Sequence, residues 1–170
     1  MPVLSTSFAE GTLSARPSAA SGNNGRYYFA TDVQVLYQSN GASWVTLTTP
    51  PPAKVALNAV DTGGGIISWV NPYGLAIIVF KLVIDVTTIA SGACSADFGT
   101  TVASATTVSD NLIDGLDVHT STGTFATIDQ AGANGKERQK LASGGWVTGS
   151  KDTGASAALV GSAYIFHAFA

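Results

Sequence analysis

Three aspartates stand close together at Asp110, Asp114 and Asp117, in the stretch DNLIDGLD. Carboxylates gathered in a loop are the usual ligands of Ca²⁺. The spacing does not fit an EF-hand, because the third loop position counted from Asp110 is Leu112 and the twelfth is Ser121, where an oxygen ligand and a bidentate Glu are needed. We therefore assign no metal here and expect a solvated or interfacial acidic turn over residues 110–117. An irregular calcium site is the alternative.

A second stretch, GANGKE over residues 132–137, has the glycines and the lysine of a phosphate-binding loop. A Walker A loop needs Gly at position 130 and Ser or Thr at position 137. Gln130 and Glu137 stand at these places, so the sequence predicts no nucleotide site.

Nucleophiles and bases are few. Cys94 is the only cysteine, and His119 and His167 are the only histidines. One cysteine excludes an internal disulfide, and three scattered side chains argue against a zinc site. The chain has no G-x-S-x-G elbow, and its histidines lie in separate segments. We predict no catalytic residue, no cofactor and no enzymatic activity.

Three tryptophans, Trp44, Trp69 and Trp146, offer a different chemistry, because flat indole faces stack on sugars. Trp69 stands in an apolar run and is expected in the core. A carbohydrate-binding module is therefore an alternative class of function.

Composition points to assembly. Charged residues make up 11% of the chain, against about 25% in ordinary soluble domains. Charged residues are depleted at interface cores, so this composition favours a homo-oligomer. The net charge of -3 and the lack of a Lys/Arg run argue against nucleic acid.

Neither a membrane span nor a secretory signal is expected. The most apolar stretch, residues 75–86, is shorter than the roughly 20 residues of a membrane helix and carries Lys81 and Asp85. It is predicted to be a buried strand. The first residues lack the basic and apolar regions of a signal peptide, so we expect synthesis in a cytoplasm.

Three consecutive prolines, at positions 50–52, stiffen the backbone and predict a spacer over residues 50–53. Residues 1–49 then form a front module: an extended or loose arm over residues 1–24, followed by a β-meander with strands at 26–30, 33–37 and 44–47. Such a module is too small to be stable alone. Its aromatic and apolar side chains are expected to need the body or sister copies for burial: Tyr27, Phe29, Val35, Tyr37 and Trp44.

Residues 54–170 are predicted to form the body, an antiparallel β-sandwich of jelly-roll type. Turn residues separate β-branched and aromatic runs, and helical turns are expected only at 109–113 and 136–142. The last strand is expected beside residues 75–86. The expected strands cover residues 55–60, 66–70, 75–86, 93–98, 123–128, 145–149 and 161–169.

The front module also resembles one found in tailed-phage fibre and virion proteins, of the form A-R-P-x-A-(x)-G-R-x-Y-F-A-T-D-x-x-x-L-Y-x-x-N-G-x-x-W. The inserted Asn23-Asn24 and the run Val33-Gln34-Val35 depart from that form. The residues in register with it are Arg16, Pro17, Gly25, Arg26, Tyr28, Phe29, Ala30, Thr31, Asp32, Leu36, Tyr37, Asn40, Gly41 and Trp44.

The body resembles a family of phage head fibre and capsid decoration proteins, so the two resemblances together cover about residues 15–170. The stretches that carry this second resemblance are NPYGLAIIVFKLVIDVTTIASGACSADFG, DNLIDGLDV, NGKERQKL, GGWVTGS and AYIFHAF.

The resemblance implies a structural protein on the capsid exterior, made in the bacterial host cytoplasm. It implies a homotrimer bound to the major capsid protein, acting as a decoration (cement) protein or head fibre. A tail or baseplate fibre component and a carbohydrate-binding host-attachment module are the alternatives. The candidate interface residues are Arg16, Arg26, Tyr28, Phe29, Leu36, Tyr37 and Trp44.

Overall fold

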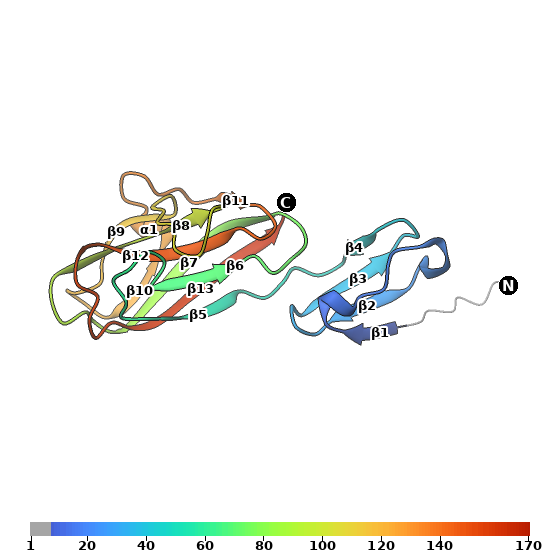
Figure 1. Ribbon diagram of the computed structural model, residues 1–170, viewed down its shortest axis with the longest axis horizontal. Coiled ribbons are helices and arrows are strands. Elements are labelled where there is room, and N and C mark those ends of the chain that lie inside the picture. The colour runs from blue at the N-terminus through green and yellow to red at the C-terminus, as the bar shows by residue number, and fades with distance from the viewer. Residues whose placement is uncertain (1–7) are drawn as a thin grey trace. The chain divides into compact units, whose positions relative to one another are not determined.

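The computed structural model describes residues 8–170, in which nearly every regular element is a strand (Figure 1). The chain divides between Pro51 and Pro52, inside the proline segment, into a front unit and a body. Each is described by itself. Among residues 8–170 no helix is long and apolar enough to cross a membrane.

The front unit is a four-stranded sheet in the order β1-β2-β3-β4. The predicted meander is present, because β2, β3 and β4 pair antiparallel in sequence. β1 was not predicted: it lies parallel to β2, in a segment expected to be extended or loose, of which residues 1–7 lie outside the described residues. The elements are β1 (Phe8–Gly11), η1 (Leu13–Ala15), η2 (Ser21–Asn23), β2 (Tyr27–Ala30), β3 (Val35–Ser39) and β4 (Trp44–Thr46).

One face of this sheet is buried within a single chain. Tyr28, Val35 and Tyr37 have relative exposures of 3%, 0% and 2%. The prediction that the module needs the body or sister copies to bury its aromatic and apolar side chains is therefore wrong for Val35 and Tyr37 on this face. Residues 12–24, read from the sequence as loose, supply the cover.

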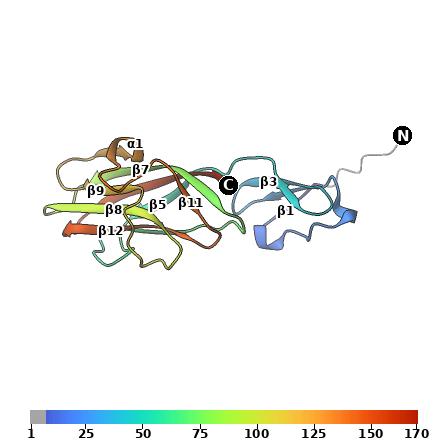
Figure 2. The same ribbon diagram turned by 90° about the horizontal axis from the view of Figure 1, so that it is seen from above.

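The body contains two antiparallel sheets (Figure 2). The β7 sheet has the order β10-β7-β13-β5, with the short β11 also paired to β7, and the β12 sheet has the order β6-β12-β8-β9. The elements are β5 (Ala53–Leu57), β6 (Ile67–Val70), β7 (Ile77–Thr88), β8 (Cys94–Thr101), β9 (Ile113–Asp117), β10 (Gly123–Ala126), α1 (Thr127–Gln130), β11 (Gln139–Leu141), β12 (Trp146–Gly154) and β13 (Val160–Phe169).

The pairing of the strands is nested. β5 pairs with β13, β6 with β12, β7 with β10, and β8 with β9. This is the arrangement of one long hairpin rolled into two layers, and with β11 set aside it gives the eight-stranded jelly roll. The predicted all-β sandwich is confirmed, as is the pairing of the last strand with residues 75–86.

The core lies between the two sheets. Ile77, Val79, Leu82 and Ile84 of β7 are fully buried, and Phe98 faces them from β8's sheet with no exposure. The prediction of a buried strand over residues 75–86 holds for one face of β7 only, since Ile78 is 36% and Phe80 is 43% exposed on the other face. An apolar run alone does not distinguish a strand covered on two faces from one covered on one.

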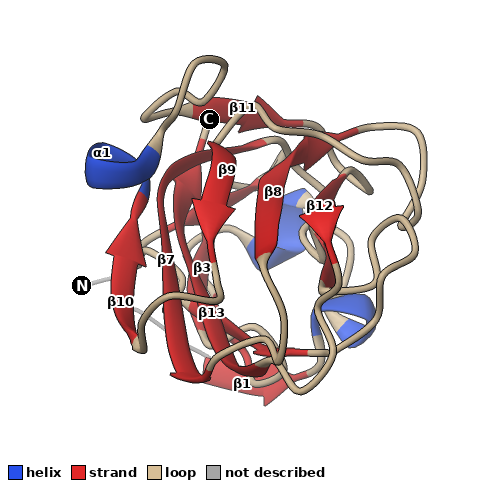
Figure 3. Cartoon of the chain, turned by 90° about the vertical axis from the view of Figure 1, so that its left-hand side faces the viewer, coloured by secondary structure: helices blue, strands red, loops and turns tan. Residues whose placement is uncertain are grey.

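The predicted helical turns are also wrong. Residues 109–112 lead into β9, and β11 occupies the middle of residues 136–142. The short helix α1 instead directly follows β10, where the strand was expected to continue to residue 128 (Figure 3). Pairing of β9 with β8 and of β11 with β7 outweighs these weak local helix signals.

Loops cover the outer face of the β12 sheet. The Thr148 hydroxyl donates a hydrogen bond to the Thr107 carbonyl oxygen (2.8 Å), and Gly64 N–H donates to Ser150 Oγ (2.7 Å). Gly99 allows close approach, because a Cβ there would lie 2.5 Å from Ser109 Oγ. Residues 61–65 and 102–111 thus form a third layer over this sheet.

Two glycines with the same backbone conformation test how closely the body is packed. Gly154 and Gly115 have φ of +76° and +75°, but a Cβ on Gly154 would overlap the Ala93 carbonyl oxygen, whereas a Cβ on Gly115 meets nothing within 4 Å. We expect Gly115→Ala to lower the free energy of unfolding by about 1 kcal/mol through backbone strain alone. Gly154→Ala is expected to cost about 2 kcal/mol more. Urea unfolding of both variants measures the difference, and equal losses would contradict this account of Gly154.

Candidate functional site

An aromatic cluster built around Arg16 fills the buried side of the front unit. The Arg16 guanidinium carbon lies 4.2 Å from the centre of the Tyr37 ring and 5.8 Å from that of Trp44. Tyr28 and Trp44 meet edge to face, with ring centres 6.1 Å apart. Nη1 of Arg16 is buried without a hydrogen-bond partner among the described residues, so the ring faces carry much of the contact with this cation.

Hydrogen bonds tie the covering segment to this cluster. Trp44 Nε1–H donates to the Pro17 carbonyl oxygen (2.7 Å), and the Tyr28 hydroxyl donates to the Thr12 carbonyl oxygen (2.8 Å). Asp32 Oδ1 accepts from the Leu13 amide (2.8 Å). Burial raises the pKa of the Tyr37 hydroxyl, and the Arg16 charge offsets part of the rise.

The turn before β4 has its own anchor in Asn40. Its Oδ1 accepts hydrogen bonds from the amides of Ala42 (3.0 Å) and Ser43 (2.7 Å). Gly41, with φ of +86°, supplies the left-handed residue that this turn requires. Many residues in register with the phage module therefore hold one front unit together.

This geometry corrects the candidate interface. Arg16, Tyr28, Tyr37 and Trp44 come together on the covered face of the front unit, where Tyr28 and Tyr37 are buried and Arg16 and Trp44 are half-buried. Arg26 precedes β2, and its backbone bonds to Asn23 and Ser39. From the sequence these residues looked like interface residues, because the cover from residues 12–24 was not recognised.

Phe29 and Leu36 are the two candidates on the outer face of the front sheet. They form a cross-strand pair, and strand alternation places the exposed or half-buried side chains of β1 and β4 on the same side. Phe8 is 61%, Val45 46% and Leu47 47% exposed. We call this surface the outer front face; its apolar and aromatic members are Phe8, Tyr27, Phe29, Leu36, Val45 and Leu47.

The acidic stretch acts as a set of turn anchors. Asp114 Oδ2 accepts from the amides of Ala133 (3.2 Å) and Asn134 (3.0 Å), and Asp110 Oδ2 accepts from the Asn134 side chain (2.8 Å). Residues 8–170 hold no group of three or more His, Cys, Asp or Glu side chains arranged to bind a metal. The prediction of a turn over residues 110–117 is wrong for its second half, which is strand β9.

Asp117 closes the turn after β9. Its Oδ1 accepts from the amides of His119 (2.8 Å) and Thr120 (3.0 Å), and its Oδ2 accepts from the Thr120 hydroxyl. These bonds lower the pKa of the Asp117 carboxyl, with the hydroxyl bond contributing most. The carboxylate is thus engaged by its own turn.

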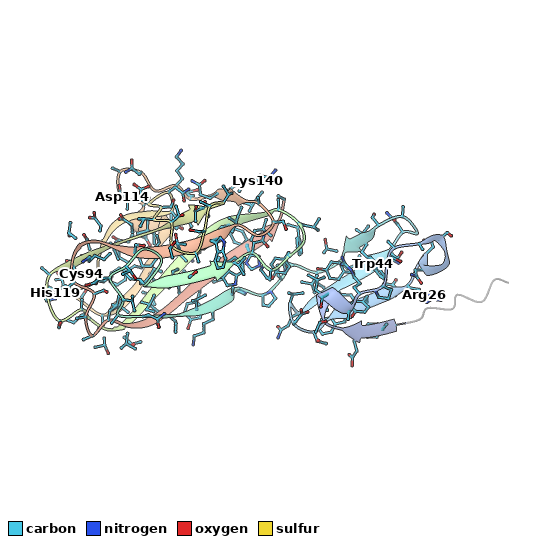
Figure 4. The ribbon with its side chains drawn as sticks, viewed as in Figure 1. Arg26, Trp44, Cys94, Asp114, His119 and Lys140 are labelled. Atoms are coloured by element: carbon cyan, nitrogen blue, oxygen red, sulfur yellow. The ribbon has the colours of Figure 1, made fainter. Side chains whose placement is uncertain are left out.

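The structure brings Cys94 and His119 together, which sequence reasoning missed. Both line a hollow of about 290 Å³ at one end of the body, beside Asp117 (Figure 4). Their chain positions are far apart, and only the pairing of β8 with β9 makes them neighbours.

The Cys94 hollow lacks the chemistry of a nucleophile. Burial raises the pKa of the Cys94 thiol, and nearby Asp61 and Asp117 raise it further. The Cys94 Sγ–H contacts the Ser95 carbonyl oxygen (3.6 Å), while His119 Nδ1 donates to the Ala90 carbonyl oxygen (2.8 Å). Among the described residues no hydrogen bond joins the Cys94 thiol to His119, and a thiol held protonated by burial and by neighbouring carboxylates is not activated.

The tryptophans do not form one platform. Trp44 belongs to the front cluster. In the β12 sheet, Trp69 is in register with Val147 and Trp146 with Val70, so the two indoles lie on opposite faces. Trp69 packs against His167 with ring centres 5.3 Å apart but is half-buried, so its predicted place in the core holds only in part.

His167 is a buried structural histidine. Its Nδ1 lies 3.0 Å from the Ile165 carbonyl oxygen, which can only accept, so Nδ1 carries the proton. Nε2 then accepts from the Tyr73 hydroxyl (3.0 Å). Burial lowers the pKa of His167.

Comparisons of the chain with protein-family models, with curated proteins and with solved structures each found no match.

The neutral His167 predicts a pH-dependent stability. Its folded-state pKa lies below the unfolded value near 6.5, so the unfolded chain binds more protons at acid pH and stability falls as pH drops below about 6.5. We expect the free energy of unfolding to decrease by about 1 kcal/mol between pH 7.5 and 5.5. Urea unfolding at the two pH values measures it.

The matched variants are His167→Asn and His119→Gln. Asn keeps a donor near the Ile165 carbonyl but does not titrate, so His167→Asn should lose most of the pH dependence while His119→Gln retains it. A loss of the dependence in the His119 variant alone would contradict the assignment.

Proposed function

We propose that the protein is a non-enzymatic structural component of a tailed-phage virion, a homotrimer that binds the outside of the capsid as a decoration protein or head fibre. Its partner is the major capsid protein, and its location is the capsid exterior after synthesis in the bacterial host cytoplasm. Its role is to add contacts that oppose rupture of the shell.

The position of the module residues supports this proposal. Arg16, Tyr28, Asp32, Asn40 and Trp44 are in register with the phage fibre module, and each makes a contact that holds the front unit together. The resemblance therefore rests on the residues that build the unit. No ligand chemistry is needed to explain them.

The observation that carries the proposal is the outer front face. Its two cross-strand rows are Phe8, Tyr27, Gln38 and Val45, and Glu10, Phe29, Leu36 and Leu47, so six of these eight side chains are apolar or aromatic. Phe8 is 61% exposed. Burying such a face is worth about 25 cal/mol per Å² of apolar surface. Three copies meeting about one axis would bury it, including Tyr27 and Phe29, two of the residues expected from the sequence to need the body or sister copies.

A tail or baseplate fibre component is the rival that shares this front module. The host-attachment alternative is weaker, because Trp69 and Trp146 lie on opposite faces of their sheet and Trp44 packs against Tyr28 within the front unit. We therefore place capsid decoration first.

Association through the outer front face is tested by its mass in solution. The 17.2 kDa chain should elute as a particle of three times that mass in size exclusion with light scattering. Phe29→Ser combined with Leu36→Ser should shift it to monomer, because the cross-strand pair at the centre of the face becomes polar. Val102→Ser, at a position 76% exposed in the body, is the control and should remain a trimer. A wild-type monomer at micromolar concentration would remove the basis of this interface.

Capsid binding is tested with shells of the encoding phage that lack this protein. The purified trimer should co-sediment with them and raise the temperature at which they rupture. An oligosaccharide array, probed with the same protein, tests the alternative of a carbohydrate-binding host-attachment module. Glycan binding without shell binding would replace decoration by host attachment.

A further inference from the structure

A β-bulge distorts the β7 sheet at Phe80. β13 pairs Phe166 with Lys81 and His167 with Val79, which leaves Phe80 without a partner. The bulge turns two successive side chains, Phe80 and Lys81, to the outer face. There the Phe80 and Phe166 ring centres lie 6.4 Å apart, and Lys81 Nζ lies 5.7 Å from the Phe166 ring centre.

At the same residues, the edge of β7 that faces away from β13 has no strand paired to it among the described residues. β10 pairs with β7 at Val83 to Val86, and β11 pairs with β7 at Ile77 to Val79. Among the described residues no strand pairs with this edge of β7 at residues 80–82. The chain between β10 and β11 leaves the sheet as α1 and the loop over residues 131–138 (Figure 3).

A hollow of about 460 Å³ opens at this unpaired edge, within the size range of ligand sites. We call it the notch. Its apolar lining comes from β7, α1 and β13, and its polar lining from β7 and the loop before β11. The residues used below are Ile78, Phe80, Lys81, Ile128, Arg138 and Ala168.

The apolar lining is open to solvent. Phe80 is 43% and Ile128 is 68% exposed, which is unusual for side chains that line a hollow. The outer face of the β12 sheet, by contrast, is covered by the chain's own loops. The notch is therefore a place where the body leaves apolar surface uncovered.

Charge around the notch is opposite in sign to that of the chain. Lys81 and Arg138 line it, Lys140 lies beside Ile78 across the strands, and Lys136 is exposed in the same loop. These are four of the eight basic residues, in a chain of net charge -3. The nearby acids are Glu137, which lines the notch, Asp129 on α1, and Asp110 and Asp114, which bind the loop over residues 131–138. Among the residues that line the notch itself, Lys81 and Arg138 stand against Glu137 alone, and this local excess of positive charge favours an acidic partner.

We propose that the notch docks an extended acidic segment of the capsid shell protein, which places one apolar side chain in the hollow and lies along the free edge of β7. The free edge covers residues 80–82, between β11 and β10, so a short part of the segment pairs with it as in strand addition while the adjacent hollow holds the apolar side chain. Lys81 and Arg138 then pair with acidic residues that flank the anchor. The identity of the partner rests on the proposed function; the peptide chemistry does not.

Two synthetic peptides test the chemistry without shells. Acetyl-EDLFDE-amide should shift the amide NMR signals of residues 78–82 and 137–140, and acetyl-KKLFKK-amide should bind at least tenfold more weakly. Phe80→Ser and Arg138→Glu should each weaken the acidic peptide at least tenfold. Val60→Ser, at an exposed site away from the notch, should bind as wild type. Equal binding of both peptides, or shifts elsewhere, would overturn the proposal.

The same variants on shells separate the two proposals. Arg138→Glu, an exposed change that leaves the core intact, should lower shell binding at least tenfold while the trimer mass stays unchanged. Undiminished shell binding would overturn the notch and leave the decoration function standing. If the protein bound the peptide but not the shells, the proposed decoration function would be wrong, and the shell protein could not be the partner that docks in the notch. A changed oligomeric mass would make the notch a contact between copies and overturn the proposal.

Discussion

The pairing of β7 with β13 is the constraint on which the body depends. β13 is the last strand of the chain, yet it lies between β7 and β5 in the middle of its sheet. The outermost pair of the nested hairpin is thus closed by the final residues, and most contacts join segments distant in sequence. Such a topology is expected to fold slowly, because the chain loses the entropy of closing long loops before the distant contacts stabilise it. The bulge at Phe80 belongs to this pairing, because the register between β7 and β13 differs by one residue before and after Phe80.

The front unit solves a different problem. Four short strands supply little core, and the unit gains cover by laying residues 12–24 across one face. A guanidinium between two aromatic rings contributes there what aliphatic side chains contribute in the body. Only one face is covered in this way. The other remains apolar and is the surface through which we propose that copies associate.

Residues that suggest catalysis serve the architecture throughout. Asp114 and Asp117 bind backbone amides, His167 is neutral between a carbonyl and a tyrosine, and Cys94 is a buried thiol. Buried or partly buried polar groups must find partners, and these have found them inside the fold. The two surfaces on which our proposals rest are the outer front face and the notch.

The sequence by itself determined the all-β class, the meander, most body strands and the absence of recognisable catalytic motifs, because alternation, turn residues and motif spacing are local properties. It also placed Phe29 and Leu36 among candidate interface residues. Only the tertiary structure decided which face of each strand is covered. Tyr28 and Tyr37 became interior because residues 12–24, which lack hydrophobic periodicity and include Arg16, fold over them. Phe80 became exposed because the register between β7 and β13 shifts at this residue. Cover and register arise from contacts between distant segments, which a local pattern does not encode.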